Sequence, residues 1–203
     1  DNDKIDLKKK NSLINLPYLK YFKDDKEFII SHSNTCLTFL GKKFGMFGET
    51  QEEELECEQL LQETVDLRAI VTRFAYTHFN SKDEELLAAK EVYNTAFENS
   101  NSGKLQKFEH WFSSKDKSKT KLFLVGNKIS SPDFNLFDTL DLYCEFLLYY
   151  NFVENADKNN VFALLKYPLI SDFFNNFKQL PKMQKYFESE LYKLPFTNKG
   201  AKF

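Results

Sequence analysis

The sequence predicts a mostly helical α+β fold, in which a short β-hairpin and one helix precede an all-helical region. Two observations lead to this prediction. Strand-like runs around a turn occur only within residues 16–31, whereas apolar residues after position 48 recur at helical spacing. The chain has 203 residues, of which 42% are hydrophobic, and its net charge is −2. These values exclude disorder as the overall state and permit a sizeable core.

The hairpin is predicted from residues 16–22 and 27–30, which flank the polar turn Lys23-Asp24-Asp25-Lys26. A helix should follow from Ser33 and end at Gly45 and Gly48, because its apolar residues Cys36, Leu37, Leu40 and Phe44 have helical spacing. A lone hairpin is marginal in water, so residues 1–48 should need further strands or a covering partner.

Apolar side chains at Leu67, Ile70, Val71 and Phe74 define one face of a long helix over about 52–79. The acidic run at 52–54 favours its start, because negative charge stabilises a helix N-terminus. Two further helices are expected over about 83–98 and 105–112, followed by a polar connector over 115–121. After the connector, Ser130-Ser131-Pro132-Asp133 should open another helix. Two more helices should follow, one containing Ile170 to Phe177 and a short one from Met183 to Leu191.

Ser130 and Asp133 have the spacing of a capping box, and Ile129 supplies the apolar residue just before the cap. We interpret this motif as purely structural. Replacement of either residue by Ala should cost about 0.5–2 kcal/mol.

Composition excludes several classes of function. The chain has only two arginines, so a nucleic-acid partner is not expected, and no apolar run approaches the roughly 20 residues of a membrane span. Cys36, Cys57 and Cys144 form no Cys-x-x-Cys pair, so neither a metal site nor a disulfide framework is predicted. A reducing intracellular compartment is expected, the cytoplasm first, with an organelle or a cytoskeletal assembly as alternatives. Because the chain begins at Asp1 without Met, we expect it to start inside a longer product.

Several short segments occur in a fixed order: Asn15-Leu16-Pro17-Tyr18-Leu19, Ser33-Asn34, Gly48-Glu49-Thr50, the run from Gly126 to Phe134, Tyr167-Pro168-Leu169 and Leu194-Pro195-Phe196-Thr197. Together they resemble glutathione transferases of the mu class. The resemblance covers almost the whole chain and implies the glutathione transferase fold. It implies a partial thioredoxin-like domain of two strands plus a helix over 1–48, which holds half of the glutathione site, and an all-helical C-terminal domain over 49–203.

The resemblance also implies glutathione-binding residues. A cis bond before Pro17 would present the Leu16 backbone to the cysteinyl group, and Ser33 at a helix start would hold the γ-glutamyl carboxylate. Asp66 would reach across a dimer to the α-amino group. The implied set is Asn15, Leu16, Pro17, His32, Ser33 and Asp66, where His32 replaces the usual Gln of the family. Each also has a structural interpretation, such as an ordinary N-cap for Ser33.

Tyr76 matches the tyrosine that lines the electrophile site of mu-class enzymes. No catalytic residue is assigned, because the family's catalytic tyrosine lies on a first strand that would precede Asp1. An ungapped comparison places Asn2 and Asp6 where mu enzymes bind glutathione through Trp and Lys. A gap of one or two residues would instead offer Lys4 or Lys8.

Two principal functions follow. The favoured one is a non-catalytic descendant, a pseudoenzyme that acts as a structural or docking subunit of a larger assembly. The alternative is an active mu-like transferase of detoxification, whose N-terminal residues precede those given and which conjugates glutathione to hydrophobic electrophiles. A glutathione or hydrophobic-ligand carrier is a third possibility. The expected partners are a second copy or other protein subunits, with glutathione as co-substrate or ligand and no further cofactor. Phe173-Phe174 and Tyr149-Tyr150 would serve an interface or the core.

Overall fold

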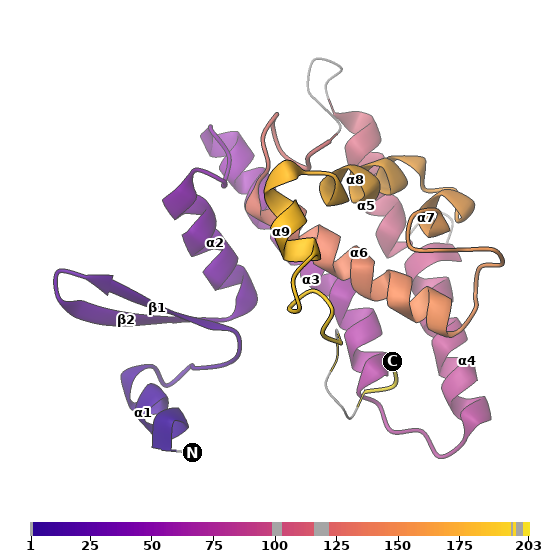
Figure 1. Cartoon of the computed structure of the whole chain (residues 1–203), viewed down its shortest axis with the longest axis horizontal. Helices are drawn as coiled ribbons and strands as arrows, with labels where there is room; N and C mark the ends of the chain where they lie inside the picture. The colour runs from indigo at the N-terminus through magenta and orange to yellow at the C-terminus, as the bar shows by residue number, and fades with distance from the viewer. Residues whose placement is uncertain (1, 99–102, 116–121, 196, 198–200) are drawn as a thin grey trace.

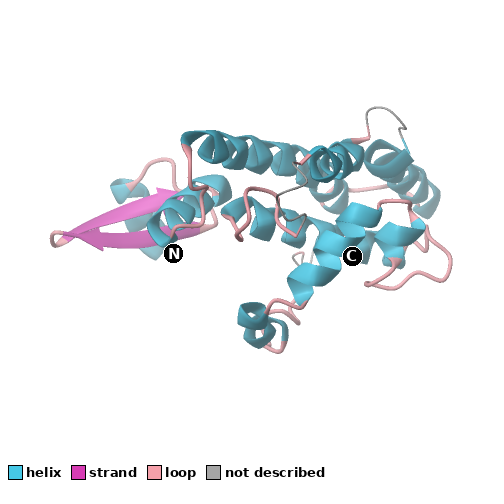
Figure 2. Cartoon of the chain, turned by 90° about the horizontal axis from the view of Figure 1, so that it is seen from above, coloured by secondary structure: helices cyan, strands magenta, loops and turns pink. Residues whose placement is uncertain are grey.

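The computed structural model describes residues 2–98, 103–115, 122–195, 197 and 201–203, and the side chains of residues 2–5 and 98 lie outside that description. The N-terminal lobe projects at one end of the molecule, and the helical domain forms the rest (Figures 1 and 2).

The N-terminal lobe contains α1 (Asn2–Lys10), β1 (Tyr18–Lys23), β2 (Lys26–Ser31) and α2 (Ser33–Phe44). The helical domain contains α3 (Gln51–Ala75), α4 (Lys82–Tyr93), the π-helical η1 (Asn94–Glu98), α5 (Lys104–Ser114), α6 (Ser131–Tyr149), α7 (Val161–Leu164), α8 (Pro168–Lys178), the 3-10 helix η2 (Pro181–Met183) and α9 (Gln184–Phe187).

The predicted hairpin is present, with β1 and β2 antiparallel and Tyr21 opposite Phe28. Helix α2 covers one face of it, where the Phe39 ring meets the Tyr21 ring edge-on at 4.9 Å between centroids. Helix α1, which the sequence analysis did not predict, lies beside β2, and the Asn11 side-chain amide just after it donates to the Ile29 carbonyl at 2.9 Å.

Helix α3 begins as predicted but ends earlier. The Thr50 hydroxyl accepts the Glu53 N–H at 3.2 Å, and three glutamates occupy the first turn. The helix stops at Ala75, four residues before the expected end, because Tyr76 closes it with φ −102° and ψ 3°. The Thr77 hydroxyl then donates to the Arg73 carbonyl at 2.8 Å, so the last turn satisfies its carbonyls locally.

Other boundaries also differ from prediction. The segment 83–98 divides into α4 and η1, α7 was not expected, and the final helix spans only Gln184–Phe187. The connector over 115–121 lies outside the described residues, apart from Lys115. The division into domains at residue 48 stays a prediction.

Helix α6 forms the centre of the core and packs along α3. The buried Tyr143 hydroxyl donates to the Leu67 carbonyl at 2.8 Å and so joins the two helices. The Phe137 ring stacks on the Phe177 ring of α8 at 4.4 Å. Phe173 and Phe174 are fully buried in the same region, so of the two expected roles they serve the core of this chain, whereas Tyr149 is exposed.

The predicted capping box at the start of α6 is present, and Asp133 does more than cap. One carboxylate oxygen accepts the Leu124 N–H, and the other accepts both the N–H and the hydroxyl of Ser130, each at 2.7 Å. Burial raises the pKa of Asp133 to about 6, while these hydrogen bonds lower it. The carboxylate therefore fixes the preceding loop as well as the helix.

Ser131 joins the two parts of the molecule. Its N–H donates to the Met46 carbonyl and its hydroxyl donates to the Leu37 carbonyl, both at 2.8 Å. A Cβ on the buried Gly41 would lie 2.3 Å from the Ser131 hydroxyl and 2.9 Å from the Phe47 ring. The close approach of α2 to α6 thus requires glycine at position 41.

Gly41→Ala should lower the free energy of unfolding by about 2 kcal/mol, because overpacking a tight contact costs roughly 1–3 kcal/mol. The matched control is Gly45→Ala, at a residue with φ +66° and no atom within 4 Å of the added Cβ. That control should lose about 1 kcal/mol from backbone conformation alone. Urea unfolding checks both values, and a Gly41→Ala protein as stable as the wild type would show that this contact relaxes freely.

Asp133→Ala should destabilise the protein by about 3 kcal/mol or more, which is above the cost of about 0.5–2 kcal/mol predicted for a cap alone. The substitution leaves three donors without their acceptor, and each buried unsatisfied group costs roughly 1–3 kcal/mol. Ser81→Ala is the control. Ser81 is an exposed cap that accepts the Glu84 N–H at 3.2 Å, and its loss should cost about 1 kcal/mol. Equal losses for the two variants in thermal or urea unfolding would contradict the role given to Asp133.

Candidate functional site

The loop before β1 and the start of α2 lie together in the N-terminal lobe. The Leu16–Pro17 bond is cis, as the resemblance implied. The Asn15 N–H donates to the Ser31 hydroxyl at 2.6 Å, and that hydroxyl donates back to the Asn15 carbonyl at 3.0 Å. Ser31 ends β2, and only His32 separates it from Ser33, the first residue of α2. The structure therefore brings Asn15, Leu16 and Pro17 next to His32 and Ser33.

His32 precedes α2 with φ 71° and ψ 135°, a conformation that residues other than glycine rarely adopt. Its side chain is exposed and caps no backbone group of α2. Ser33 is exposed at the first position of the helix, where the N–H groups of the first turn have no intrahelical acceptor. This end of α2 can attract a carboxylate, which is the role that the resemblance gave to Ser33.

The Leu16 backbone is already engaged within the chain. Its N–H donates to the Asn15 side-chain oxygen at 2.9 Å, although the Leu16 side chain is 79% exposed. A peptide ligand that used the same N–H would have to displace the Asn15 side chain. The loop has the cis bond that the resemblance implied for a ligand-binding turn, but the Leu16 N–H is already bonded to the Asn15 side chain.

Asp66 and Tyr76 lie elsewhere, on α3 and at its end. Asp66 is exposed, and its carboxylate lies 3.6 Å from the ammonium of Lys104 on α5. Tyr76 is about half exposed, next to Ala75, whose carbonyl accepts the Lys202 N–H at 3.1 Å. Among the described residues, no contact joins Asp66 to the start of α2, and its role across a dimer stays a prediction.

Helix α1 carries the remaining predicted residues. Asp6 is exposed and forms an ion pair with Lys9 at 3.2 Å on the same helix. Lys8 is exposed on the solvent side of this helix. The side chains of Asn2 and Lys4 lie outside the described part of the chain. The roles suggested for these four residues stay predictions.

Two contacts, one beneath the loop before β1 and one between α3 and α6, were missed by sequence reasoning. The thiol of Cys36 is buried beneath the loop, 3.6 Å from the Ile30 carbonyl, and burial raises its pKa. Arg68 lies 2.5 Å from the Asp138 carboxylate and so joins α3 to α6. Because the chain has only two arginines, Arg68 could have been singled out from the sequence. Its partner Asp138 could not, since it lies 70 residues away.

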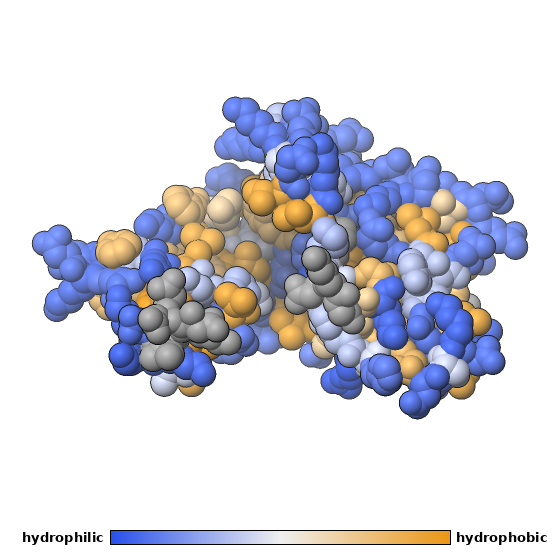
Figure 3. Space-filling view, turned by 60° about the horizontal axis from the view of Figure 1, so that its bottom comes forward, coloured by the Kyte–Doolittle hydropathy of each residue, from blue (hydrophilic) through white to orange (hydrophobic). Residues whose placement is uncertain are grey.

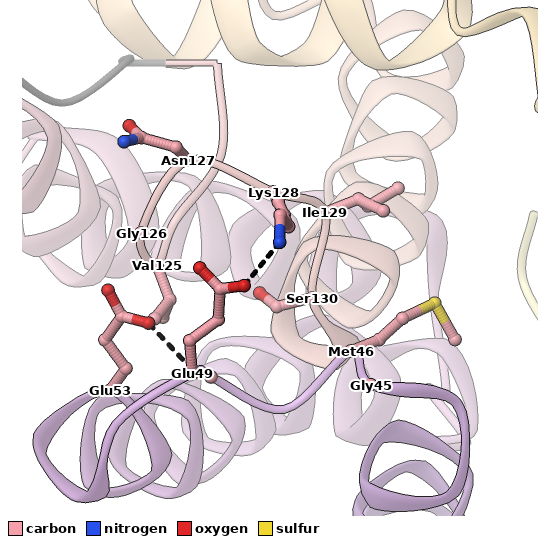
Figure 4. Close-up of a pocket in the computed structure, with 11 residues that line it drawn as sticks. Gly45, Met46, Glu49, Glu53, Val125, Gly126, Asn127, Lys128, Ile129 and Ser130 are labelled. Atoms are coloured by element: carbon pink, nitrogen blue, oxygen red, sulfur yellow. Dashed lines mark hydrogen bonds and ion pairs between the residues drawn. The ribbon is translucent and has the colours of Figure 1, made fainter.

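A small pocket lies where the loop after α2 meets the loop before α6 (Figure 4). Glu49 and Lys128 form an ion pair across it, and the Glu53 carboxylate accepts the Glu49 N–H at 2.9 Å. Hydrogen bonding to the Glu49 carboxylate raises the pKa of Lys128. These contacts hold the loops to each other, so we interpret the pocket as a structural joint.

Seen from below Figure 1, the surface is hollowed between the N-terminal lobe and the helical domain, with hydrophobic side chains around the hollow (Figure 3). Among the described residues, no group of three or more His, Cys, Asp or Glu side chains could hold a metal ion. The described helices include none that is both long and apolar enough to span a bilayer.

Comparison with known proteins agrees with this architecture. A family model described as the C-terminal domain of glutathione S-transferase matches residues 65–190. The chain is 28% identical to a class-mu 26 kDa glutathione S-transferase of Schistosoma mansoni, covering 94% of this chain and 74% of the relative. It is also 28% identical to human glutathione S-transferase P, over 87% of this chain and 72% of the relative.

Two solved structures share the fold. The glutathione S-transferase Blo t 8 superposes with a TM-score of 0.72 at 20% identity, over 97% of this chain and 81% of that one. The Pi-class glutathione S-transferase of Onchocerca volvulus superposes with a TM-score of 0.64 at 23% identity, over 88% of this chain and 74% of that one. The predicted fold is thereby confirmed, while relatives of both the mu and pi classes leave the class open. The chain belongs to the glutathione S-transferase family.

Proposed function

We propose that this protein is a non-catalytic member of the family that serves as a structural or docking subunit of a larger assembly. The observation that carries the proposal is that groups assigned to glutathione already have partners within the chain. The Leu16 N–H bonds the Asn15 side chain, and Asp66 lies beside Lys104. A ligand at this site would have to compete with both contacts, and His32 lacks the paired donor and acceptor of the usual glutamine.

The N-terminal lobe supports the same proposal. Its sheet has two strands, and Phe22 and Phe28 on them are 67% and 48% exposed. Large exposed aromatic side chains on a small sheet are typical of surfaces that contact other proteins.

The second candidate is an active transferase that conjugates glutathione to hydrophobic electrophiles. It is supported by the cis bond before Pro17, by Ser33 at the start of α2, and by similarity to relatives named as glutathione S-transferases. Asp66 and Tyr76 favour the mu class within this candidate. Cys36, Cys57 and Cys144 are free thiols, which supports a reducing compartment for either function.

The full-length protein, given glutathione and an aryl halide, should show a rate equal to the uncatalysed reaction, because the Leu16 N–H and the Asp66 carboxylate are already engaged. Tyr76→Phe should therefore change nothing. Tyr149→Phe is the matched control, since Tyr149 is 55% exposed and Tyr76 is 49% exposed. A measurable rate that falls in Tyr76→Phe but not in Tyr149→Phe would establish the active enzyme instead.

In its native source the protein should elute in a particle much larger than twice its 24.0 kDa mass, because a docking subunit stays with its partners. Native gel filtration with antibody detection measures this size. A free dimer of twice the chain mass would count against the docking proposal, as family members without fixed partners would show that size.

A further inference from the structure

The inference rests on the docking function proposed above and concerns the kind of partner segment that the helical domain binds. Residues 201–203 lie against the end of α3, at the mark C in Figure 1. The Lys202 N–H donates to the Ala75 carbonyl at 3.1 Å. Ala75 is the last residue of α3, and the last carbonyls of a helix have no donor within it. The segment therefore supplies a donor that the helix itself lacks.

The Lys202 side chain meets a buried carboxylate and an aromatic ring. Its ammonium lies 3.6 Å from the Glu85 carboxylate and 5.3 Å from the centroid of the Phe79 ring. Glu85 also accepts hydrogen bonds from Lys82 at 2.9 Å and from the Tyr150 hydroxyl at 2.7 Å, and both bonds lower its pKa. The Glu85 side chain is thus charged at neutral pH although only 11% of it is exposed. A buried carboxylate beside the face of a ring selects a cation.

The Phe203 ring packs among aromatic side chains at the ends of α3 and α6. Its centroid lies 5.6 Å from that of Phe146 and 6.4 Å from that of Phe74, to which it is stacked at 26°. The centroids of Tyr149 and Tyr150 follow at 6.2 and 6.5 Å. Aromatic pairs attract one another at these separations. The site that receives residues 202 and 203 is called the aromatic socket below, and it consists of Phe74, Phe79, Glu85, Phe146, Tyr149 and Tyr150.

Residues 201–203 are held in the aromatic socket by contacts that can exchange. Among the described residues, one main-chain hydrogen bond joins them to the helices. Lys202 is 24% exposed, and an ion pair that water reaches is weak. Leu194 and Pro195, earlier in the same segment, are exposed, so the chain approaches the socket along the surface. A segment held in this way competes with a similar segment of another protein rather than excluding it.

The charges at the aromatic socket identify the segment that fits. The first four residues of α4 are one lysine and three acids, Lys82, Asp83, Glu84 and Glu85. This excess of negative charge favours a cation beside Glu85 and opposes a carboxylate there, while the rings favour an aromatic residue next to the cation. A second copy of the chain already has its own segment seated, so exchange between copies gains no contact.

From this geometry we propose that the aromatic socket binds a segment of a partner protein in which a lysine is followed directly by an aromatic residue, and that residues 201–203 are its internal competitor. The partner's lysine takes the place of Lys202 between Glu85 and the Phe79 ring. Its aromatic ring takes the place of Phe203. Docking of the partner releases residues 201–203, so the free chain carries its own inhibitor of docking.

The test uses the full-length protein and two blocked tetrapeptides. Gly-Ala-Lys-Phe repeats residues 200–203, and Gly-Ala-Glu-Phe is the control. Followed by NMR, the lysine peptide should displace residues 201–203, which is seen as faster hydrogen exchange of the Lys202 amide. The glutamate peptide should need about a tenfold higher concentration for the same effect, because an ion pair with Glu85 is replaced by a repulsion.

A double variant, Lys202→Ala with Phe203→Ala, empties the aromatic socket. It should bind the lysine peptide about tenfold more tightly than the wild type does, because a tethered competitor acts at a local concentration in the millimolar range. Adding Glu85→Gln should remove most of the difference between the two peptides. Glu91→Gln is the matched control, at an exposed acid on the same helix, and should leave the difference unchanged. If the emptied variant does not fold, exchange of the Lys202 amide in the wild type still decides the question.

Three results would overturn the inference. The first is a Lys202 amide whose exchange does not change in excess lysine peptide, and the second is an emptied variant that folds but does not bind this peptide. Either would mean that residues 201–203 are ordinary packing of the fold. The third is equal binding of both peptides, which would mean that Glu85 selects no cation.

The failure of this inference differs from the failure of the proposed function. If the aromatic socket binds neither peptide while the protein stays inactive toward glutathione and its native particle is large, docking uses another surface and the proposed function stands. Conjugating activity would reject the proposed function itself, whatever the socket binds.

Discussion

The buried carboxylate of Asp133 is the constraint on which the positions of the other parts depend. It accepts three hydrogen bonds, from Leu124 and from two groups of Ser130, so the loop before α6 and the first turn of α6 are fixed by one side chain. A buried carboxylate is tolerated there because its oxygens are satisfied and because it lies at a helix N-terminus. Ser131, held in place by this turn, then bonds the carbonyls of Leu37 and Met46. The position of α2, and of the hairpin that packs on it, follows from that joint.

The predictable part of the fold was the part with strong local signals. Helices α3, α6 and α8 were expected because their apolar residues repeat at helical spacing over several turns, and the hairpin because a polar turn separates two apolar runs. Helix α1 escaped because residues 2–10 are largely polar, and Asn11 and Lys10 anchor this segment to β2 through contacts that no local pattern encodes. The four-residue α7 is too short to leave a periodic signal.

The candidate site was predictable only through resemblance. Nothing in the composition around Leu16 or Ser33 distinguishes a ligand-binding loop from an ordinary turn and N-cap, because both use the same residue types. The partner of Asp66 could not be inferred either, since Lys104 lies on a different helix and the pair forms only when α3 and α5 pack together. The hydrogen bond from the Leu16 N–H to the Asn15 side chain joins neighbouring residues, so a sequence pattern could in principle predict it. It was not predicted, because an asparagine side chain has several alternative donors and acceptors nearby.

The two parts of the molecule differ in what holds them together. In the helical domain, α6 and α8 share stacked aromatic rings around Phe137. The hairpin has one face covered by α2 and one edge covered after α1, and Phe22 is exposed. A two-stranded sheet is marginal on its own, so this lobe is the region whose local stability is lowest.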